Sequence, residues 1–183
     1  MTCIVGLVQG NRVYIGGDSA SANGSSITTS AVPKLFTNGH FLIGYTSSWR
    51  MGQILEHHLR IEERELPMLG DSQQEFMVCV FVERVRELFK TYGYAKLENN
   101  EESAGEFLVG YHGHLYHIES DYQVGETKNG MDACGSGEAY ALGALYPTKN
   151  GTLTPYQRID IALEAAMEFS PFVRPPFIVK EIG

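Results

Sequence analysis

The stretch TCIVGLVQGNRVYIGGDS (residues 2–19) contains two apolar segments joined by the turn GNR. Residues 3–9 and 13–20 are largely apolar on both alternating faces, which is typical of strands in a sheet that is covered on each side. A hydroxyl residue, Thr2, stands directly before the first segment, and a lone carboxylate, Asp18, lies among small residues near the end of the second. This stretch predicts two strands of a layered fold.

The composition is that of one soluble globular domain spanning residues 1–183, with 43% apolar and 20% charged residues. A net charge of −8 argues against nucleic acid or a membrane surface as a partner, because both require basic patches. Cys3, Cys79 and Cys134 lack metal-ligand spacing and are expected to be free thiols. With no signal-peptide pattern and no long apolar run, we expect a cytoplasmic protein.

The remaining pattern predicts further strands and helices in alternating groups. The expected strands are 34–37, 40–46, 106–111, 114–120 and 177–182, and the expected helices are 49–63, 71–93, 136–146 and one beginning at Thr154. Residues 98–106 are charged and are expected to form a solvated loop. Strands followed by paired helices, twice over and ending in a strand, predict a layered α+β sandwich.

Thr2 becomes the first residue if Met1 is removed, which is expected when the second residue is small. The freed α-amine titrates near ~8 in model compounds, so part of it is neutral at pH 7 and is able to act as a base for the weakly nucleophilic hydroxyl. While Met1 is attached, the Thr2 nitrogen is an amide and cannot be a base.

Three other polar residues have positions that suit this chemistry. Lys34 stands at the start of an expected strand, and a lysine beside the nucleophile favours loss of the hydroxyl proton. The Asp18 carboxylate could hold that lysine. Ser136 lies between two glycines at an expected helix start, where an N-cap role is an equally good interpretation.

The sequence gives only weak evidence for a dinucleotide site or a metal site. The segment GSGEAY begins like a dinucleotide fingerprint, but Tyr140 replaces the third glycine and no βαβ unit surrounds it. His112, His114 and His117 straddle an expected hairpin turn, so they are poorly placed to share a zinc ion. We expect no metal and no cofactor.

Taken together, the residues resemble the proteasome β-type peptidases, and most of all the bacterial HslV-type subunit, within the N-terminal-nucleophile hydrolases. The resemblance runs from Thr2 to Ile182 and rests on TCIVGLVQGNRVYIGGDS, on Lys34, on FLIGYTSS, on GSGEAYALGAL and on ALEAAMEFSPF. It implies a four-layer αββα sandwich.

The resemblance also implies a role for each catalytic residue. Thr2 Oγ would attack a peptide carbonyl, with its own α-amine as general base. Lys34 would lower the effective pKa of the hydroxyl, and Asp18 would orient Lys34. The Gly44 N–H would donate to the oxyanion, and Ser136 would hydrogen-bond near the Thr2 amine.

Several positions of the implied site are unusual for the family. Glu168 stands where the family usually has an aspartate that supports Ser136, and Pro171 stands where many members have a serine. Ser47 and Ser48 replace small residues and glycine after the oxyanion strand. The substrate pocket is expected to include Ser21, Val32 and Thr46.

The family resemblance further implies partners. The expected assembly is a homo-oligomeric ring enclosing the active sites, with peptides or unfolded proteins as substrates and a separate AAA+ ATPase to unfold them. Two alternatives remain open at this point. One is an inactive scaffold or binding member of the same fold that keeps Met1, and the other is an N-terminal-nucleophile amidase that cleaves a small amide or γ-glutamyl bond.

Overall fold

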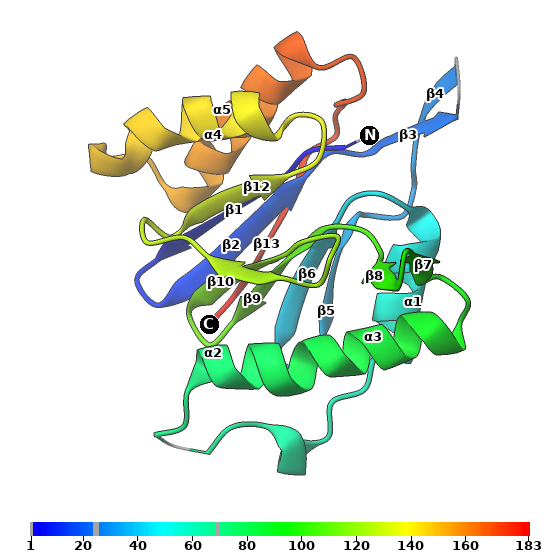
Figure 1. Ribbon diagram of the computed structural model, residues 1–183. Helices are drawn as coiled ribbons and strands as arrows, with labels where there is room; N and C mark the ends of the chain where they lie inside the picture. Colours follow the sequence, from blue (N-terminus) through cyan, green and yellow to red (C-terminus); the bar gives the residue numbers. More distant parts are fainter. Residues whose placement is uncertain (1, 24–25, 69) are drawn as a thin grey trace.

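A computed structural model describes residues 2–23, 26–68 and 70–183 of the chain. Two antiparallel sheets lie face to face, and helices cover the outer face of each sheet (Figure 1). The predicted four-layer αββα sandwich is therefore confirmed.

The first sheet has the strand order β12-β1-β2-β13 and the second the order β11-β10-β9-β6-β5. The strands of the first sheet are β1 (Ile4–Gln9), β2 (Arg12–Gly17), β12 (Met131–Cys134) and β13 (Ile178–Ile182). Those of the second are β5 (Leu35–Asn38), β6 (Phe41–Tyr45), β9 (Phe107–Tyr111), β10 (His114–Ile118) and β11 (Val124–Glu126). Every pairing within the two sheets is antiparallel.

The helices form the two outer layers. One layer holds α4 (Glu138–Leu145) and α5 (Pro155–Phe169), which lie over the first sheet (Figure 1). The other holds α1 (Trp49–His58), α2 (Gln73–Phe76), the π-helical turn η2 (Met77–Phe81) and α3 (Val82–Thr91). Short 3-10 turns occur at η1 (Glu63–Glu65) and η3 (Tyr146–Asn150). No helix in the described ranges is both long and apolar enough to span a bilayer.

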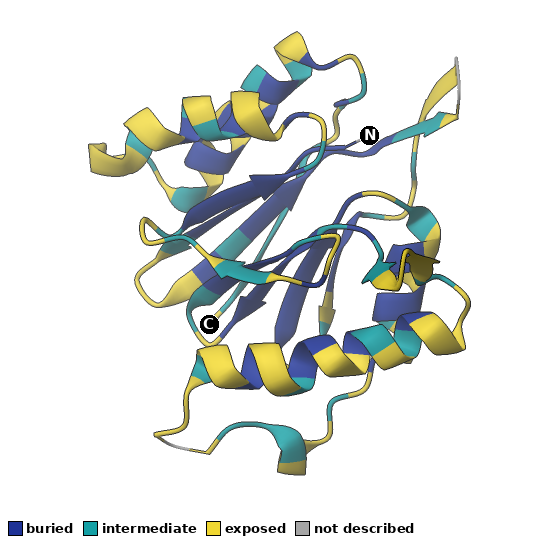
Figure 2. Cartoon of the chain, in the orientation of Figure 1, coloured by how far each residue is buried: buried dark blue, intermediate teal, exposed yellow. Residues whose placement is uncertain are grey.

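Three apolar clusters separate the four layers, and the sheets are the most buried part of the molecule (Figure 2). Strand β1 shows why residues 3–9 are apolar on both faces. Ile4 belongs to the cluster between the two sheets, whereas Val5 and Leu7 belong to the cluster beneath α4 and α5. Successive side chains of a strand point to opposite faces, so a central strand of this sandwich needs apolar residues at every position.

The predicted helix starts follow capping rules. Ser72 accepts a hydrogen bond from Glu75 N at the start of α2, and Thr154 forms a complete capping box with Gln157 at the start of α5. Two features differ from expectation. Residues 98–106 contribute to a hairpin of β7 (Lys96–Glu98) and β8 (Glu101–Ser103) rather than a plain loop, and a hairpin of β3 (Ala20–Asn23) and β4 (Ser26–Thr29) was not expected.

The two sheets approach closely because glycines face the space between them. A Cβ atom on Gly44 would lie 2.7–2.8 Å from side-chain atoms of Ile4, Ile15 and Leu35, and one on Gly110 would lie 2.8 Å from Val13 Cγ1. Such distances are shorter than van der Waals contact, so a side chain at either position would force the sheets apart.

We expect Gly44→Ala to lower the free energy of unfolding by about 1–3 kcal/mol, because the added methyl overpacks the cluster between the sheets. Gly143→Ala is the matched control. A Cβ added to Gly143 in α4 would meet no described atom within 4 Å apart from its chain neighbours and the local helix backbone. Its replacement should therefore leave stability unchanged or raise it by up to ~1 kcal/mol. Urea denaturation of both variants measures the difference. Equal stability of the two variants would contradict this account of the sheet spacing.

His117 and Asp132 form an ion pair between the two sheets. His117 Nδ1 on β10 lies 3.5 Å from Asp132 Oδ1 on β12, and both residues are buried. Burial lowers the pKa of His117, but Asp132, Glu119 and Glu106 outweigh it, and the net pKa is raised above 6.5.

A raised histidine pKa in the folded state stabilises the protein fully below the unfolded value of ~6.5, and this contribution is lost as the pH rises through the folded value. Asp132→Asn should therefore reduce stability by up to about 1 kcal/mol at pH 6 and by less at pH 9. Denaturation of wild type and variant at both pH values checks this. A deficit that grows toward pH 9 would be inconsistent with the charge pair.

Candidate active site

The pairing of β1 with β2 brings the two ends of the first sequence stretch together. Ile4 faces Gly17 in this register, so Thr2 and Asp18 lie at the same end of the hairpin. Asp18 is fixed there by three backbone contacts. Its N–H donates to Cys3 O at 3.3 Å, and its carboxylate accepts from Cys3 N at 3.0 Å and Ala20 N at 2.8 Å.

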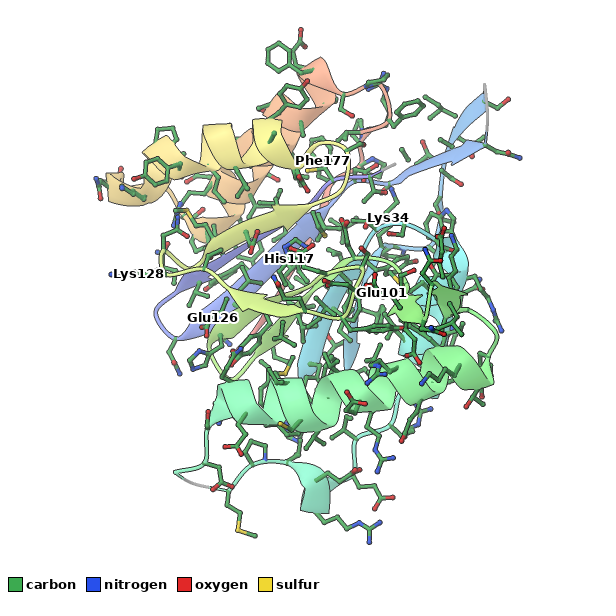
Figure 3. The ribbon with its side chains drawn as sticks, in the orientation of Figure 1. Lys34, Glu101, His117, Glu126, Lys128 and Phe177 are labelled. Atoms are coloured by element: carbon green, nitrogen blue, oxygen red, sulfur yellow. The ribbon has the colours of Figure 1, made fainter. Side chains whose placement is uncertain are left out.

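Lys34 stands directly before β5 and is labelled in Figure 3; its side chain contacts this hairpin end. Its Nζ donates to Asp18 Oδ1 at 2.9 Å, to Asp18 Oδ2 at 3.0 Å and to Thr2 Oγ1 at 2.5 Å. Thr2, Asp18 and Lys34 are each no more than 4% exposed. The three residues that sequence reasoning connected are thus in direct contact.

Burial lowers the pKa of Lys34, and the adjoining Asp18 carboxylate opposes that shift. An ammonium that points at a hydroxyl oxygen favours the alkoxide over the alcohol, because the charge of the alkoxide is stabilised in a site shielded from water. The arrangement therefore suits activation of the Thr2 hydroxyl as a nucleophile.

The loop before α4 holds the backbone of Thr2. Thr2 N donates to Ser136 Oγ at 3.3 Å, Ser136 Oγ donates to Thr2 O at 3.3 Å, and Gly137 N donates to the same carbonyl. Gly135 has a φ of +96°, and a Cβ there would collide with Thr2 O. Ser136 does not cap α4, whose N-cap is Gly137 without a side-chain bond. Its hydroxyl instead forms hydrogen bonds with the backbone of Thr2.

Ser170, rather than Glu168, lies next to Ser136. The Ser170 Oγ is 3.4 Å from Ser136 Oγ and is buried at the C-terminal end of α5. Glu168 is exposed and has no hydrogen bond to Ser136 or Thr2 among the described residues. The expected supporting role of Glu168 is therefore corrected, because the last turn of α5 directs residue 170, and not residue 168, toward Ser136.

The Gly44 N–H is also placed differently from expectation. Tyr45 N donates to Lys34 O and Thr46 N donates to Glu106 O, so successive N–H groups of β6 point alternately to its two neighbours. Gly44 N–H accordingly points toward β9, within the sheet, and Gly44 does not line the cavity beside Thr2. This position excludes it as an oxyanion donor.

Ser47 is the better candidate for that donor. It follows β6 with a φ of +60°, which is unusual for a residue with a side chain, and it lines the cavity beside Thr2. Within the described ranges its N–H makes no hydrogen bond. Strained backbone of this kind often occurs at functional sites. The strain itself was not visible in the sequence, which offered at this point only the unusual pair Ser47-Ser48.

A cavity of about 80 Å³ opens beside the Thr2 hydroxyl. It is lined by Thr2, Ala20, Ala22, Lys34, Tyr45, Thr46, Ser47, Ser48 and Trp49. Of the three residues expected in a substrate pocket, Thr46 lines it, whereas Ser21 and Val32 do not. Trp49, the only tryptophan of the chain, also lines the cavity but is not among the pocket residues expected from the sequence. Its position just after Ser47-Ser48 was the one available signal.

The three histidines of the hairpin region contact three different residues. His112 stacks on His40, His114 contacts Glu126, and His117 faces Asp132. Throughout residues 2–23, 26–68 and 70–183, no group of three or more histidine, cysteine or acidic side chains is arranged to hold a metal ion.

Removing the Asp18 carboxylate should be costly, because it leaves the buried Lys34 ammonium unpaired. We expect Asp18→Ala to lower the free energy of unfolding by about 3–5 kcal/mol. The double variant Asp18→Ala/Lys34→Met should recover part of this loss, because it no longer buries an unpaired charge. Thermal and urea denaturation of the three proteins tests the pair. A loss below 1 kcal/mol for Asp18→Ala would show that Lys34 is not held as an ion.

Comparison with known proteins identifies the fold. No protein-family model and no curated protein sequence matches the chain. Among solved structures, BPH from Thiobacillus denitrificans in complex with epoxomicin is 21% identical, with 99% of this chain and 98% of that chain covered and a TM-score of 0.81. Eukaryotic HslV from Trypanosoma brucei is 19% identical, with 98% of each chain covered and a TM-score of 0.72. Anbu, an ancestral beta-subunit from Yersinia bercovieri, is 15% identical, with 99% and 81% covered and a TM-score of 0.67. The chain therefore has the fold of the proteasome-like N-terminal-nucleophile hydrolases.

Proposed function

We propose that the protein is a threonine peptidase whose nucleophile is the hydroxyl of Thr2, exposed as the first residue when Met1 is removed. One observation carries the proposal. The Lys34 ammonium lies between the Thr2 hydroxyl and the Asp18 carboxylate, in a buried position beside an open cavity. Met1 itself lies outside the described residues.

The reaction follows from the groups around Thr2. The free α-amine accepts the hydroxyl proton, Oγ bonds to the peptide carbonyl carbon, and the proton then passes to the departing amine as the peptide bond breaks. Water releases the acyl group from the resulting ester. Ser136 Oγ, 3.3 Å from the Thr2 nitrogen, holds the amine in place, and Ser170 supports Ser136.

The Ser47 N–H supplies the oxyanion donor in this mechanism. Ser47 lines the same cavity as Thr2, and its N–H donates to no acceptor among the described residues. A preformed backbone donor of this type typically accounts for ~10²–10³ in rate.

The fold shared with HslV and Anbu supports a self-associating peptidase subunit. We propose a homo-oligomeric ring that acts on peptides or unfolded proteins and relies on a separate AAA+ ATPase for folded substrates. The free thiols of Cys3, Cys79 and Cys134 agree with a reducing compartment such as the cytoplasm. Burial raises the pKa of Cys3 to about 12, so this thiol does not compete with Thr2 as a nucleophile.

A catalytically inactive scaffold is the second candidate. If Met1 stays attached, the Thr2 nitrogen is an amide and cannot accept the hydroxyl proton. In that state the Lys34 and Asp18 pair still has a structural role, because it joins the β1–β2 hairpin to the start of β5.

Thr2→Ala should abolish peptide hydrolysis, because it removes the attacking oxygen and leaves the sandwich intact. Thr2→Ser is the matched control. It keeps a hydroxyl in reach of Lys34 and should retain measurable turnover. Release of a coumarin from peptide amides gives kcat/KM, and size-exclusion chromatography shows whether assembly is unchanged. Turnover by Thr2→Ala equal to that of wild type would remove Thr2 from the mechanism.

A further inference from the structure

The cavity beside Thr2 is small, and its size limits the substrate. We propose that the enzyme cleaves after small, uncharged residues, and that Trp49 is the specificity-determining residue that excludes larger ones. This inference rests on the proposed peptidase function, and it names the substrate class of the same site.

The walls of the cavity determine which part of the substrate enters it. A carbonyl carbon under attack lies next to Thr2 Oγ1, and its oxygen points to the Ser47 N–H. Thr2 and Ser47 both line the cavity. The side chain of the residue that carries this carbonyl, here called the acyl residue, therefore enters the cavity itself.

The volume limits how much of the acyl side chain the cavity can enclose. The cavity measures about 80 Å³, whereas an engineered cavity that binds benzene in another protein measures ~150 Å³. A methyl or hydroxymethyl group fits within this volume, whereas a phenyl ring exceeds it and would extend through the open side of the cavity. The short side chains of Ala20 and Ala22 form part of the wall, so the restriction comes from the larger lining residues.

Trp49 is the large lining residue that is held at the edge of the core. It is the first residue of α1, whose N-cap Ser48 accepts a hydrogen bond from Arg50 N at 3.1 Å. The indole packs edge-on against Tyr45 at 6.0 Å between ring centroids, and Lys34 Nζ lies 5.9 Å from its ring centroid. Contacts with an aromatic ring and with a cation hold the indole in place.

Tyr45 cannot move aside to enlarge the cavity. It is buried, its ring lies where a Cβ on Gly52 of α1 would be, and it also contacts Phe36. Core packing therefore fixes the side of the cavity that Tyr45 forms, and overpacking that side would displace core side chains.

Charge gives a second restriction. Among the described residues that line the cavity there is no carboxylate, and the ionisable side chains are those of Tyr45 and Lys34. A lysine or arginine side chain of a substrate would meet no opposite charge in the cavity and would approach a cation. The site therefore disfavours basic as well as bulky acyl residues.

The experiment uses the full chain with Met1 removed and four peptide coumarin amides that differ only at the acyl residue, which is alanine, leucine, phenylalanine or arginine. For the wild type we expect kcat/KM to be at least tenfold higher for the alanine substrate than for the phenylalanine or arginine substrate, because one or two misplaced carbons already cost this much in a rigid pocket.

Variants at Trp49 then test whether this residue determines specificity. The quantity compared is the ratio of kcat/KM for the alanine substrate to kcat/KM for the phenylalanine substrate, measured within each protein. Trp49→Ala should lower the alanine-to-phenylalanine ratio of kcat/KM by at least tenfold, and Trp49→Phe should give an intermediate ratio. Thermal denaturation shows whether each variant is folded. If Trp49→Ala does not fold, Trp49→Phe alone tests the assignment.

The outcomes separate the inference from the proposed function. Wild-type hydrolysis of the phenylalanine substrate as fast as the alanine substrate, or an unchanged ratio in folded Trp49 variants, overturns the assignment while the peptidase function stands. Hydrolysis of none of the four substrates by the processed wild type overturns the peptidase function and the assignment with it.

Discussion

The buried ammonium of Lys34 is the interaction on which the rest of the structure depends. A charge placed where water is largely excluded must be paired, and here the Asp18 carboxylate pairs it at 2.9 Å while Thr2 Oγ1 takes a further hydrogen bond. The three residues come from two segments of the chain. The β1–β2 hairpin supplies Thr2 and Asp18, and the start of β5 supplies Lys34. The same contact therefore joins the two sheets and prepares the hydroxyl for chemistry.

The sandwich makes this contact possible by keeping its sheets close. Glycines such as Gly44 and Gly110 face the opposite sheet and leave room for the apolar residues between the layers. At the end where Thr2 lies, the Gly135–Gly137 loop and the C-terminal end of α5 complete the surroundings of the nucleophile. Backbone N–H groups thus hold the Asp18 carboxylate and the Thr2 carbonyl, whereas Lys34 and Ser136 hold the Thr2 hydroxyl and nitrogen through their side chains. Fixed partners of this kind are what electrostatic preorganisation requires.

The alternation of strands and helices predicts a layered α+β sandwich, because apolar periodicity is a local property of the chain. The family resemblance adds the four layers and the link between Thr2, Asp18 and Lys34. The oxyanion donor and the support of Ser136 were mispredicted, since they depend on details that spacing does not encode. Hydrogen-bond direction within β6 removes Gly44, and the pitch of the last turn of α5 selects Ser170 over Glu168. The role proposed for Trp49 can be inferred only from the cavity that it lines in the structure.

The central claim is that Thr2 is a free N-terminal nucleophile, and the most direct test is mass spectrometry of the purified protein after treatment with a peptide epoxyketone. This probe needs both the hydroxyl and the free amine of one N-terminal residue. The account predicts a chain lighter by one methionine residue, with a single adduct that peptide mapping places on Thr2. A chain that lacks Met1, is folded and remains unlabelled would contradict it.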